Sequence, residues 1–112
     1  MEEFIRYLEG KITAGRAESA SLAAEGRNDD ADFAKVKTNI YDVAKTVSLA
    51  LMKRPGAGVG AIGEQFERFR TGWGAALEKA KAHGDARNVA VEETKLAALE
   101  DVIARFREVT GA

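Results

Sequence analysis

The chain has 112 residues, 17 basic and 18 acidic side chains, and no cysteine. This length suits one domain over residues 1–112, and the 46% of apolar residues is ordinary for a folded protein. A chain without cysteine has no disulfide framework, no thiolate metal site and no cysteine nucleophile. No stretch approaches the roughly 18 apolar residues of a membrane-spanning helix, and the acidic start lacks the apolar segment of a signal peptide. We therefore expect a cytoplasmic protein.

The two signs of charge are spread evenly along the chain, which has a formal net charge of -1. Binding to duplex nucleic acid or to an anionic membrane requires a clustered positive face, and no segment of the sequence supplies one. Nucleic acids and membranes are therefore not expected as partners.

Residues 2–25 are predicted to form the first helix, because apolar and small residues recur every three or four positions. This inward stripe comprises Phe4, Leu8, Ile12, Gly15, Ser19 and Leu22. Gly26 is placed to end the helix in a left-handed conformation. A second set of small residues lies partly off the stripe: Gly10, Ala14, Ala17, Ala20, Ser21 and Ala24. This small-residue face either closes the bundle or pairs with another chain.

A second helix is predicted from about residue 28 to residue 53, with Asn28, Asp29 or Asp30 as its N-cap. Its apolar stripe is the most regular in the chain: Phe33, Val36, Ile40, Val43, Val47 and Ala50. Four further residues widen this face: Tyr41, Ala44, Ser48 and Leu51. The helix should end before Pro55, because the residue preceding a proline is pushed out of the helical conformation.

Residues 54–63 are rich in glycine, and Gly58, Gly60 and Gly63 match the spacing G-x-G-x-x-G. Such a loop can bind an anion through free N–H groups at a helix N-terminus, and Lys53 and Arg54 would add positive charge. The dinucleotide-binding form of this motif follows a strand, however, and here a helix precedes it. An acid, Glu64, also stands where phosphate would lie. The sequence therefore favours a flexible connection between two hairpins, with an anion site at residues 53–63 as the alternative.

The third helix is predicted over about residues 61–83. Its stripe comprises Ile62, Phe66, Phe69, Trp73, either Ala76 or Leu77, and Ala80. Gly72 and Gly74 interrupt it, each costing about 1 kcal/mol relative to alanine. They indicate a close helix crossing beside Trp73, or a local break that opens a pocket beside Phe69 and Trp73. A kink at Gly72 and Gly74 is also possible.

The last helix is predicted over about residues 85–109, capped by Asp85 after a turn at His83 and Gly84. Its stripe comprises Val89, Leu96, Leu99, Ile103 and Phe106. Glu92 falls in the same register, and we expect it near the end of the bundle with access to solvent. His83 is the single histidine and does not belong to a Glu-x-x-His pair, so a di-iron site is not expected.

These segments predict an all-α fold: an antiparallel four-helix bundle made of two helical hairpins joined by a Gly-rich loop. No catalytic constellation, metal site or cofactor site emerges from the sequence. We therefore expect a non-enzymatic protein that acts through contact with a protein partner or by self-association. A small-molecule or anion-binding module built on residues 53–63 is the alternative.

Overall fold

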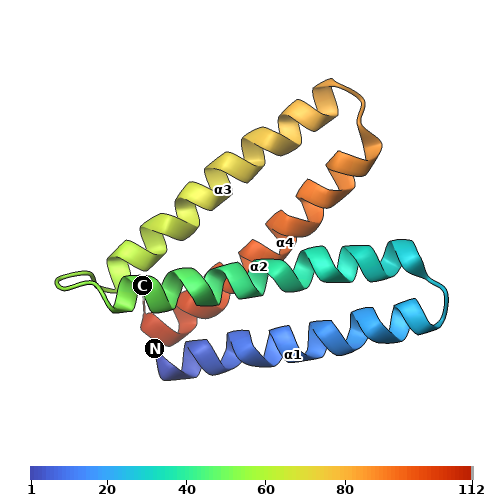
Figure 1. Ribbon diagram of the computed structural model, residues 1–112. Coiled ribbons are helices and arrows are strands. Elements are labelled where there is room, and N and C mark those ends of the chain that lie inside the picture. Colours follow the sequence, from blue (N-terminus) through green and yellow to red (C-terminus); the bar gives the residue numbers. More distant parts are fainter. Residues whose placement is uncertain (112) are drawn as a thin grey trace.

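The computed structural model describes residues 1–111 and contains four helices in an antiparallel arrangement (Figure 1). They are α1 (Glu2–Ala24), α2 (Asn28–Met52), α3 (Val59–Ala82) and α4 (Ala86–Thr110). Helix α1 packs against α2 and α3 packs against α4, so the chain forms two hairpins packed as a bundle. The predicted fold class is confirmed, and all the predicted helix ends are correct to within two residues.

The two hairpin turns have the same construction. Gly26 and Gly84 both adopt a left-handed conformation, with φ of 77° and 64°. After Gly26, the N–H of Arg27 donates to the carbonyl of Leu22 at 2.9 Å, and after Gly84 the N–H of Asp85 donates to the carbonyl of Ala80 at 3.0 Å. This six-to-one hydrogen bond is the mark of a Schellman motif, which satisfies carbonyls at the end of a helix.

The N-caps differ between the second and fourth helices. The Asp85 carboxylate accepts the N–H of Asn88 at 3.1 Å, as the sequence predicted. The predicted side-chain cap of α2 is wrong. Arg27 occupies the N-cap position without a capping hydrogen bond, and Asn28 is already helical. The guanidinium of Arg27 instead pairs with Asp30 at 2.9 Å.

The connection between the hairpins is shorter than predicted, because it spans only residues 53–58. Gly60 and Gly63 lie inside the first turns of α3, whose start is fixed by the burial of Ile62 and Phe66. A Cβ atom on Gly63 would lie 3.4 Å from the Phe106 ring, which is an ordinary van der Waals distance. Tertiary packing therefore extends the helix into a segment whose glycines predicted a loop.

Helices α1 and α2 approach each other closely at Gly15. A Cβ atom built on Gly15 would collide with the side chain of Thr38, so only glycine fits here. One turn further on, the buried Ser19 hydroxyl donates to the carbonyl of Ala31 at 3.1 Å. The predicted stripe of α1 is confirmed at Phe4, Leu8 and Ile12, which are almost fully buried.

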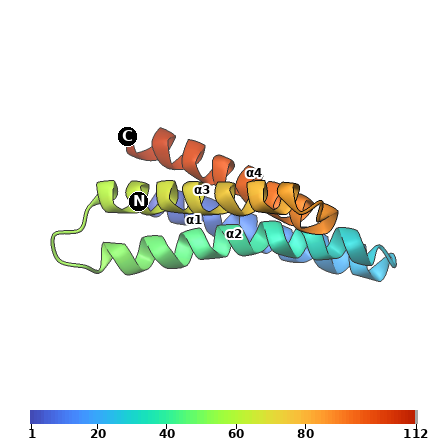
Figure 2. The ribbon, with the colours of Figure 1, turned by 90° about the horizontal axis from the view of Figure 1, so that it is seen from above.

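The core lies towards the end of the molecule that carries the connection 53–58, where the start of α1 meets the end of α4. The Phe106 ring is 5.3 Å from both the Phe4 ring and the Phe66 ring, in edge-on geometry. These distances are typical of favourable aromatic pairs. Seen from above, the connection loops out beyond this end (Figure 2).

The apolar stripe predicted for α2 is only partly confirmed. Ile40 is buried, but Ala50 is exposed and four large members are only half-buried: Phe33, Val36, Val43 and Val47. Three of the residues expected to widen the stripe are buried beside Ile40: Tyr41, Ala44 and Ser48. The buried face also contains three residues that the prediction did not include: Ala31, Ala34 and Thr38. Small side chains on this face allow the close contact with α1, which leaves the larger side chains beside it partly uncovered.

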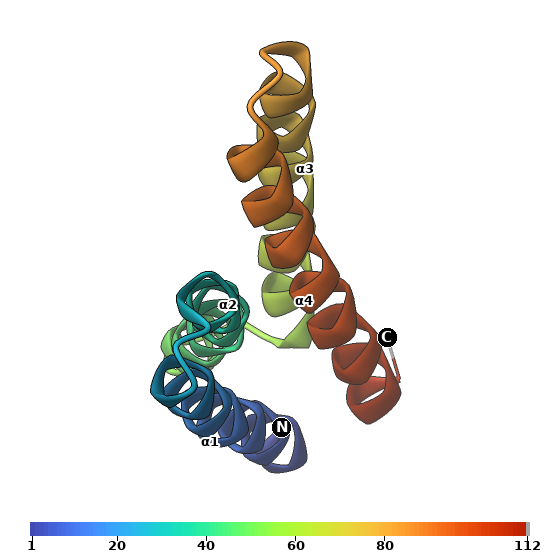
Figure 3. The same ribbon diagram turned by 90° about the vertical axis from the view of Figure 1, so that its right-hand side faces the viewer.

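The two hairpins diverge away from the core. Figure 1 shows the α1–α2 turn and the α3–α4 turn at well-separated points, and Figure 3 shows the α3–α4 hairpin standing away from its neighbour. The radius of gyration is 15.1 Å, whereas a compact chain of this length has a value of about 13 Å. The bundle is therefore closed at one end and open at the other.

Helix α3 runs without interruption through Gly72 and Gly74, so the kink considered from the sequence is absent from this helix. A Cβ atom at either glycine would meet no atom within 4 Å. The close helix crossing predicted beside Trp73 therefore does not account for these two glycines.

Candidate functional site

The proposed anion site at residues 53–63 is divided between a turn and a helix. Gly58 is the N-cap of α3, whereas Gly60 and Gly63 are helical. The N–H of Gly63 is the fifth in the helix, and only the first four N–H groups of a helix lack an internal partner. Lys53 and Arg54 belong to the exposed turn that follows α2.

An apolar pocket of about 270 Å³ opens beside these glycines, between α3 and α4. Its wall contains Phe66, Ile103 and Phe106, and its charged members are Glu64, Glu67 and Arg107. Glu67 is paired with Arg107 at 3.3 Å. Neither Lys53 nor Arg54 lines the pocket, so the basic and glycine residues of the predicted site do not converge on one cavity. The pocket suits an apolar side chain better than an anion.

Phe69 and Trp73, which the sequence singled out, form a parallel stack with ring centroids 4.9 Å apart and planes 4° apart. Both side chains are half-buried and pack against the core. The ammonium of Lys95 on α4 lies 4.7 Å from the Trp73 ring centroid, within the range of a cation–π interaction. The predicted pair is therefore a packed cluster that spans α3 and α4.

Glu92 completes this cluster. It lies near the end of the hairpin as expected, but its access to solvent is small. Its side chain is only 16% exposed and lies 3.3 Å from the Lys95 ammonium, whose own side chain is 23% exposed. Partial burial of a carboxylate is tolerated when a cation compensates its charge. Trp73, Lys95 and Glu92 thus form a continuous row from ring to cation to anion.

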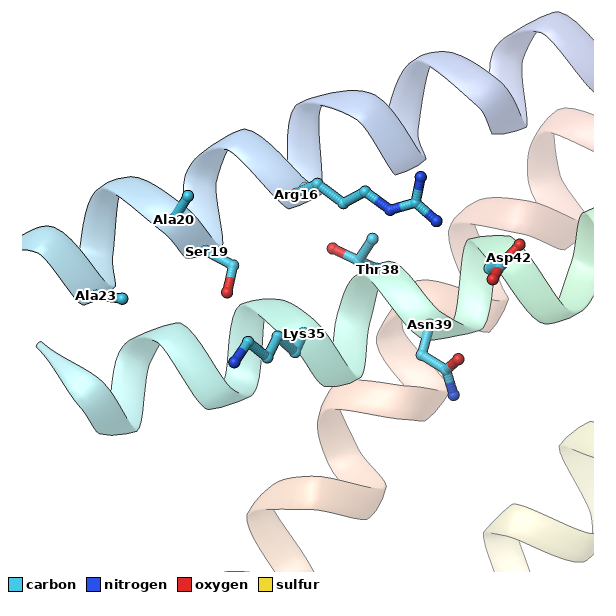
Figure 4. Close-up of a pocket in the computed structure, with 9 residues that line it drawn as sticks. Arg16, Ser19, Ala20, Ala23, Lys35, Thr38, Asn39 and Asp42 are labelled. Atoms are coloured by element: carbon cyan, nitrogen blue, oxygen red, sulfur yellow. The ribbon is translucent and has the colours of Figure 1, made fainter.

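A groove of about 380 Å³ runs along the outside of the α1–α2 hairpin (Figure 4). Its small floor residues on α1 include Gly15, Ser19 and Ala20. Arg16 extends along the groove towards Asp42, and Lys35 lies nearer to Ser19. The groove therefore carries charges of both signs over a floor of small residues, an arrangement that suits polar side chains of a partner.

The two hydroxyl groups in this groove are already engaged. Ser19 donates to the carbonyl of Ala31, and Thr38 donates to the carbonyl of Ala34 at 2.7 Å. Each bond is local to the hairpin and satisfies a buried side chain. Neither hydroxyl has a neighbouring histidine or carboxylate that would activate it as a nucleophile, among its hydrogen-bond partners in residues 1–111.

The small-residue face of α1 is exposed along its whole length. All six of its members are accessible: Gly10, Ala14, Ala17, Ala20, Ser21 and Ala24. The possibility that this face closes the bundle is therefore contradicted, because the bundle is built on the opposite stripe of α1. The structure leaves the face available to another molecule.

A tyrosine pair that the sequence gave no reason to join links three helices. The Tyr41 hydroxyl donates to the Asp101 carboxylate at 3.1 Å, and the rings of Tyr7 and Tyr41 are 6.3 Å apart. Burial, reinforced by the negative charge of Asp101, raises the pKa of both phenols. The guanidinium of Arg105 lies 5.1 Å from the Tyr7 ring centroid. The residues are too far apart in the sequence for any local pattern to reveal the pair.

His83 lies at the C-terminal end of α3, as predicted. Its Nδ1 is 2.8 Å from the carbonyl oxygen of Lys79, which suits an N–H donating to the end of the helix.

Across residues 1–111, no group of three or more histidine, aspartate or glutamate side chains is placed to hold a metal ion. No helix in that part of the chain is both long and apolar enough to cross a membrane.

Comparison of the chain with models of protein families, with curated proteins and with solved structures finds no significant match.

Proposed function

We propose that this chain is a non-enzymatic cytoplasmic helical protein that acts through protein–protein contacts, and that it self-associates. The observation that supports this proposal is the open end of the bundle. The accessible surface is 6600 Å², whereas a compact monomer of 12.0 kDa exposes about 6000 Å². A fold that leaves this additional surface uncovered gains stability when another protein covers it.

The exposed face of α1 gives the proposal a second support. Glycine and alanine side chains allow two helix backbones to approach closely, so a face made of them suits a partner helix. The charged groove on the same hairpin, with Arg16, Lys35 and Asp42, adds polar groups that can orient such a partner. The hairpin α1–α2 therefore offers both close contact and specificity.

The test of self-association is the mass of the protein in solution. Light scattering during size-exclusion chromatography, from about 1 to 100 µM, should give a mass that rises from 12.0 kDa towards a multiple of it. A mass of 12.0 kDa over the whole concentration range would contradict self-association.

The alternative, an anion-binding module at residues 53–63, has weaker support. The acids Glu64 and Glu67 line the pocket beside the glycines, and a carboxylate there repels phosphate. A thermal-shift panel of nucleotides and phosphorylated metabolites tests this alternative directly. We expect no rise in the melting temperature, whereas ligand at 100 times its dissociation constant would add about 2.7 kcal/mol of stability.

A further inference from the structure

The apolar pocket between the start of α3 and the end of α4 reaches the core of the molecule. Phe66, Ile103 and Phe106 line it, and each of these side chains is at most 3% exposed. They are held by the aromatic core, so the pocket is largely preformed, as ligand sites usually are. Val59 also lines the pocket and is one of the three large apolar side chains that are exposed in residues 1–111. A ligand seated here would cover apolar surface that the fold leaves in water.

Two glycines supply the space for such a ligand. Gly60 and Gly63 are separated by one turn, so they lie on the same side of α3, and both line the pocket. A Cβ atom on Gly60 would meet no other atom within 4 Å, and one on Gly63 would meet the Phe106 ring. A larger side chain at Gly60 would therefore take up part of the pocket volume of about 270 Å³.

The volume suits a small ligand with one apolar group. An apolar cavity of roughly 150 Å³ can hold benzene, and pockets for drug-sized molecules begin at roughly 300 Å³. A pocket of about 270 Å³ lies between these sizes. It has room for an aromatic ring or a branched aliphatic group that carries a short chain.

The charges at the pocket select among ligands of this size. Glu67 is compensated, because it pairs with Arg70 at 3.1 Å and with Arg107 at 3.3 Å. Glu64 also lines the pocket, is exposed, and makes no ion pair or hydrogen bond within residues 1–111. The positive pole at the start of α3 lies beside the negative pole at the end of α4, so the two helix dipoles largely offset each other. The free carboxylate of Glu64 therefore favours a cationic group.

We propose that this pocket binds a small hydrophobic amine, with its apolar group against Phe66 and Phe106 and its ammonium group at Glu64. Apolar burial supplies the affinity, and the carboxylate supplies the preference for a cation. This site goes beyond the protein contacts proposed above. It lies between α3 and α4, whereas the charged groove and the small-residue face belong to the α1–α2 hairpin.

Amide NMR spectra and calorimetric titration of the full chain test the site with three probes that share one aromatic ring. Phenethylamine, phenethyl alcohol and hydrocinnamate carry a cationic, a neutral and an anionic end. We expect phenethylamine to bind with a dissociation constant of about 1 mM, phenethyl alcohol roughly threefold more weakly, and hydrocinnamate more weakly than both. The amide signals of Gly60 and Gly63 should shift on binding, whereas the signal of Gly10 on α1 should not.

Two variants separate the apolar pocket from the carboxylate. Gly60→Leu fills the pocket and should abolish binding of both the amine and the alcohol. Gly72→Leu is its matched control, because it makes the same change on the same helix at a position outside the pocket. Glu64→Gln should weaken binding of the amine roughly threefold and leave the alcohol unaffected. Glu78→Gln, at an exposed position of α3, is the control for this loss of charge. Circular dichroism verifies that each variant is helical.

Three results would overturn this inference. If phenethylamine at about 10 mM shifts neither glycine signal, the pocket does not bind this class of ligand. If the signals of Gly10 and Gly72 shift as much as those of Gly60 and Gly63, the contact is not specific to the pocket. If Glu64→Gln binds the amine as tightly as the unmodified chain does, the assigned charge is wrong. Glu64→Gln alters no packed side chain, so this last comparison holds even if Gly60→Leu fails to fold. None of these results depends on whether the chain self-associates.

Discussion

At the scale of single residues, two glycines of the same helix have opposite roles. Gly15 lies against Thr38, where no side chain fits, whereas a Cβ atom on Gly10 would meet nothing within 4 Å. Glycine in a helix costs stability relative to alanine unless a close contact requires it. Only Gly15 has such a contact. A substitution at Gly10 therefore reports helix propensity, and a substitution at Gly15 reports the packing of α1 against α2.

We expect Gly15→Ala to destabilise the fold by about 1–3 kcal/mol, because the new methyl group forces α1 and α2 apart. Gly10→Ala should instead stabilise the fold by about 0.5–1 kcal/mol. Urea unfolding followed by circular dichroism measures both variants. Equal effects of the same sign would show that the Gly15–Thr38 contact does not limit the helix spacing.

The row formed by Trp73, Lys95 and Glu92 makes a second prediction possible. Lys95→Met keeps an apolar stem beside Trp73 but leaves the Glu92 carboxylate without its cation, so we expect a loss of about 1–3 kcal/mol. The double variant Glu92→Gln/Lys95→Met should recover part of this loss, since it removes the uncompensated charge. Trp73 is the single tryptophan, so its fluorescence reports unfolding directly. No recovery in the double variant would mean that the two side chains do not interact.

The tyrosine pair predicts a loss of stability in alkali. Burial raises the pKa of Tyr7 and Tyr41 above the ordinary value of about 10, so the folded state favours the neutral phenols. Their contribution is complete below that ordinary pKa and is lost as the pH rises through the higher pKa of the folded state. Melting temperatures between pH 8 and roughly pH 11 should fall more steeply for the unmodified chain than for Tyr41→Phe. Parallel curves for the two proteins would argue against a buried, coupled pair.

At the scale of elements, α3 is the helix with the weakest intrinsic support. It contains four glycines, Gly60, Gly63, Gly72 and Gly74, and its second half has a single buried residue, Ala80. The helix nevertheless runs unbroken from Val59 to Ala82. Packing against α4 and the ion pair of Arg70 with Glu100, at 2.7 Å, offset its low propensity.

Alanine at Gly72 and Gly74 should therefore stabilise α3. Each substitution is expected to add about 0.5–1 kcal/mol, and the two effects should be nearly additive because neither side chain meets another residue. Thermal unfolding of the two single variants and the double variant measures the gain. A destabilised double variant would indicate that the backbone here needs the freedom of glycine.

The elements also show what local sequence can and cannot predict. Gly26, Pro55 and Gly84 identified the ends of α1, α2 and α3, because turn chemistry depends on neighbouring residues. The start of α3 was missed by two residues, because it lies inside a segment whose glycines predicted a loop. The stripe of α2 was only partly correct, because periodicity reports that one side of a helix is apolar and not which neighbouring helix covers it. Glu92 was placed near solvent for the same reason, since its partner Lys95 and the ring of Trp73 depend on how α3 meets α4. The anion site of residues 53–63 rested on a glycine spacing and two neighbouring basic residues, whereas the apolar cavity beside the glycines contains two carboxylates and neither Lys53 nor Arg54.

At the scale of the whole molecule, the open bundle links stability to concentration. If two copies cover each other's uncovered surface, dimerisation stabilises the folded chain by mass action. The melting temperature should then rise with protein concentration between about 1 and 100 µM. A melting temperature independent of concentration in the unmodified chain would speak against any stabilising association.

The position of the core also divides the molecule by local stability. Phe4, Phe66 and Phe106 hold the helices together near the connection 53–58, whereas residues 67–79 and 86–97 contain no fully buried side chain. Few buried contacts mean a low free energy of local opening. The α3–α4 turn can therefore fray, and the angle between the hairpins can widen or narrow, while the aromatic core stays intact. The distance between the α1–α2 turn and the α3–α4 turn is therefore the feature of the fold that changes at the lowest cost in free energy.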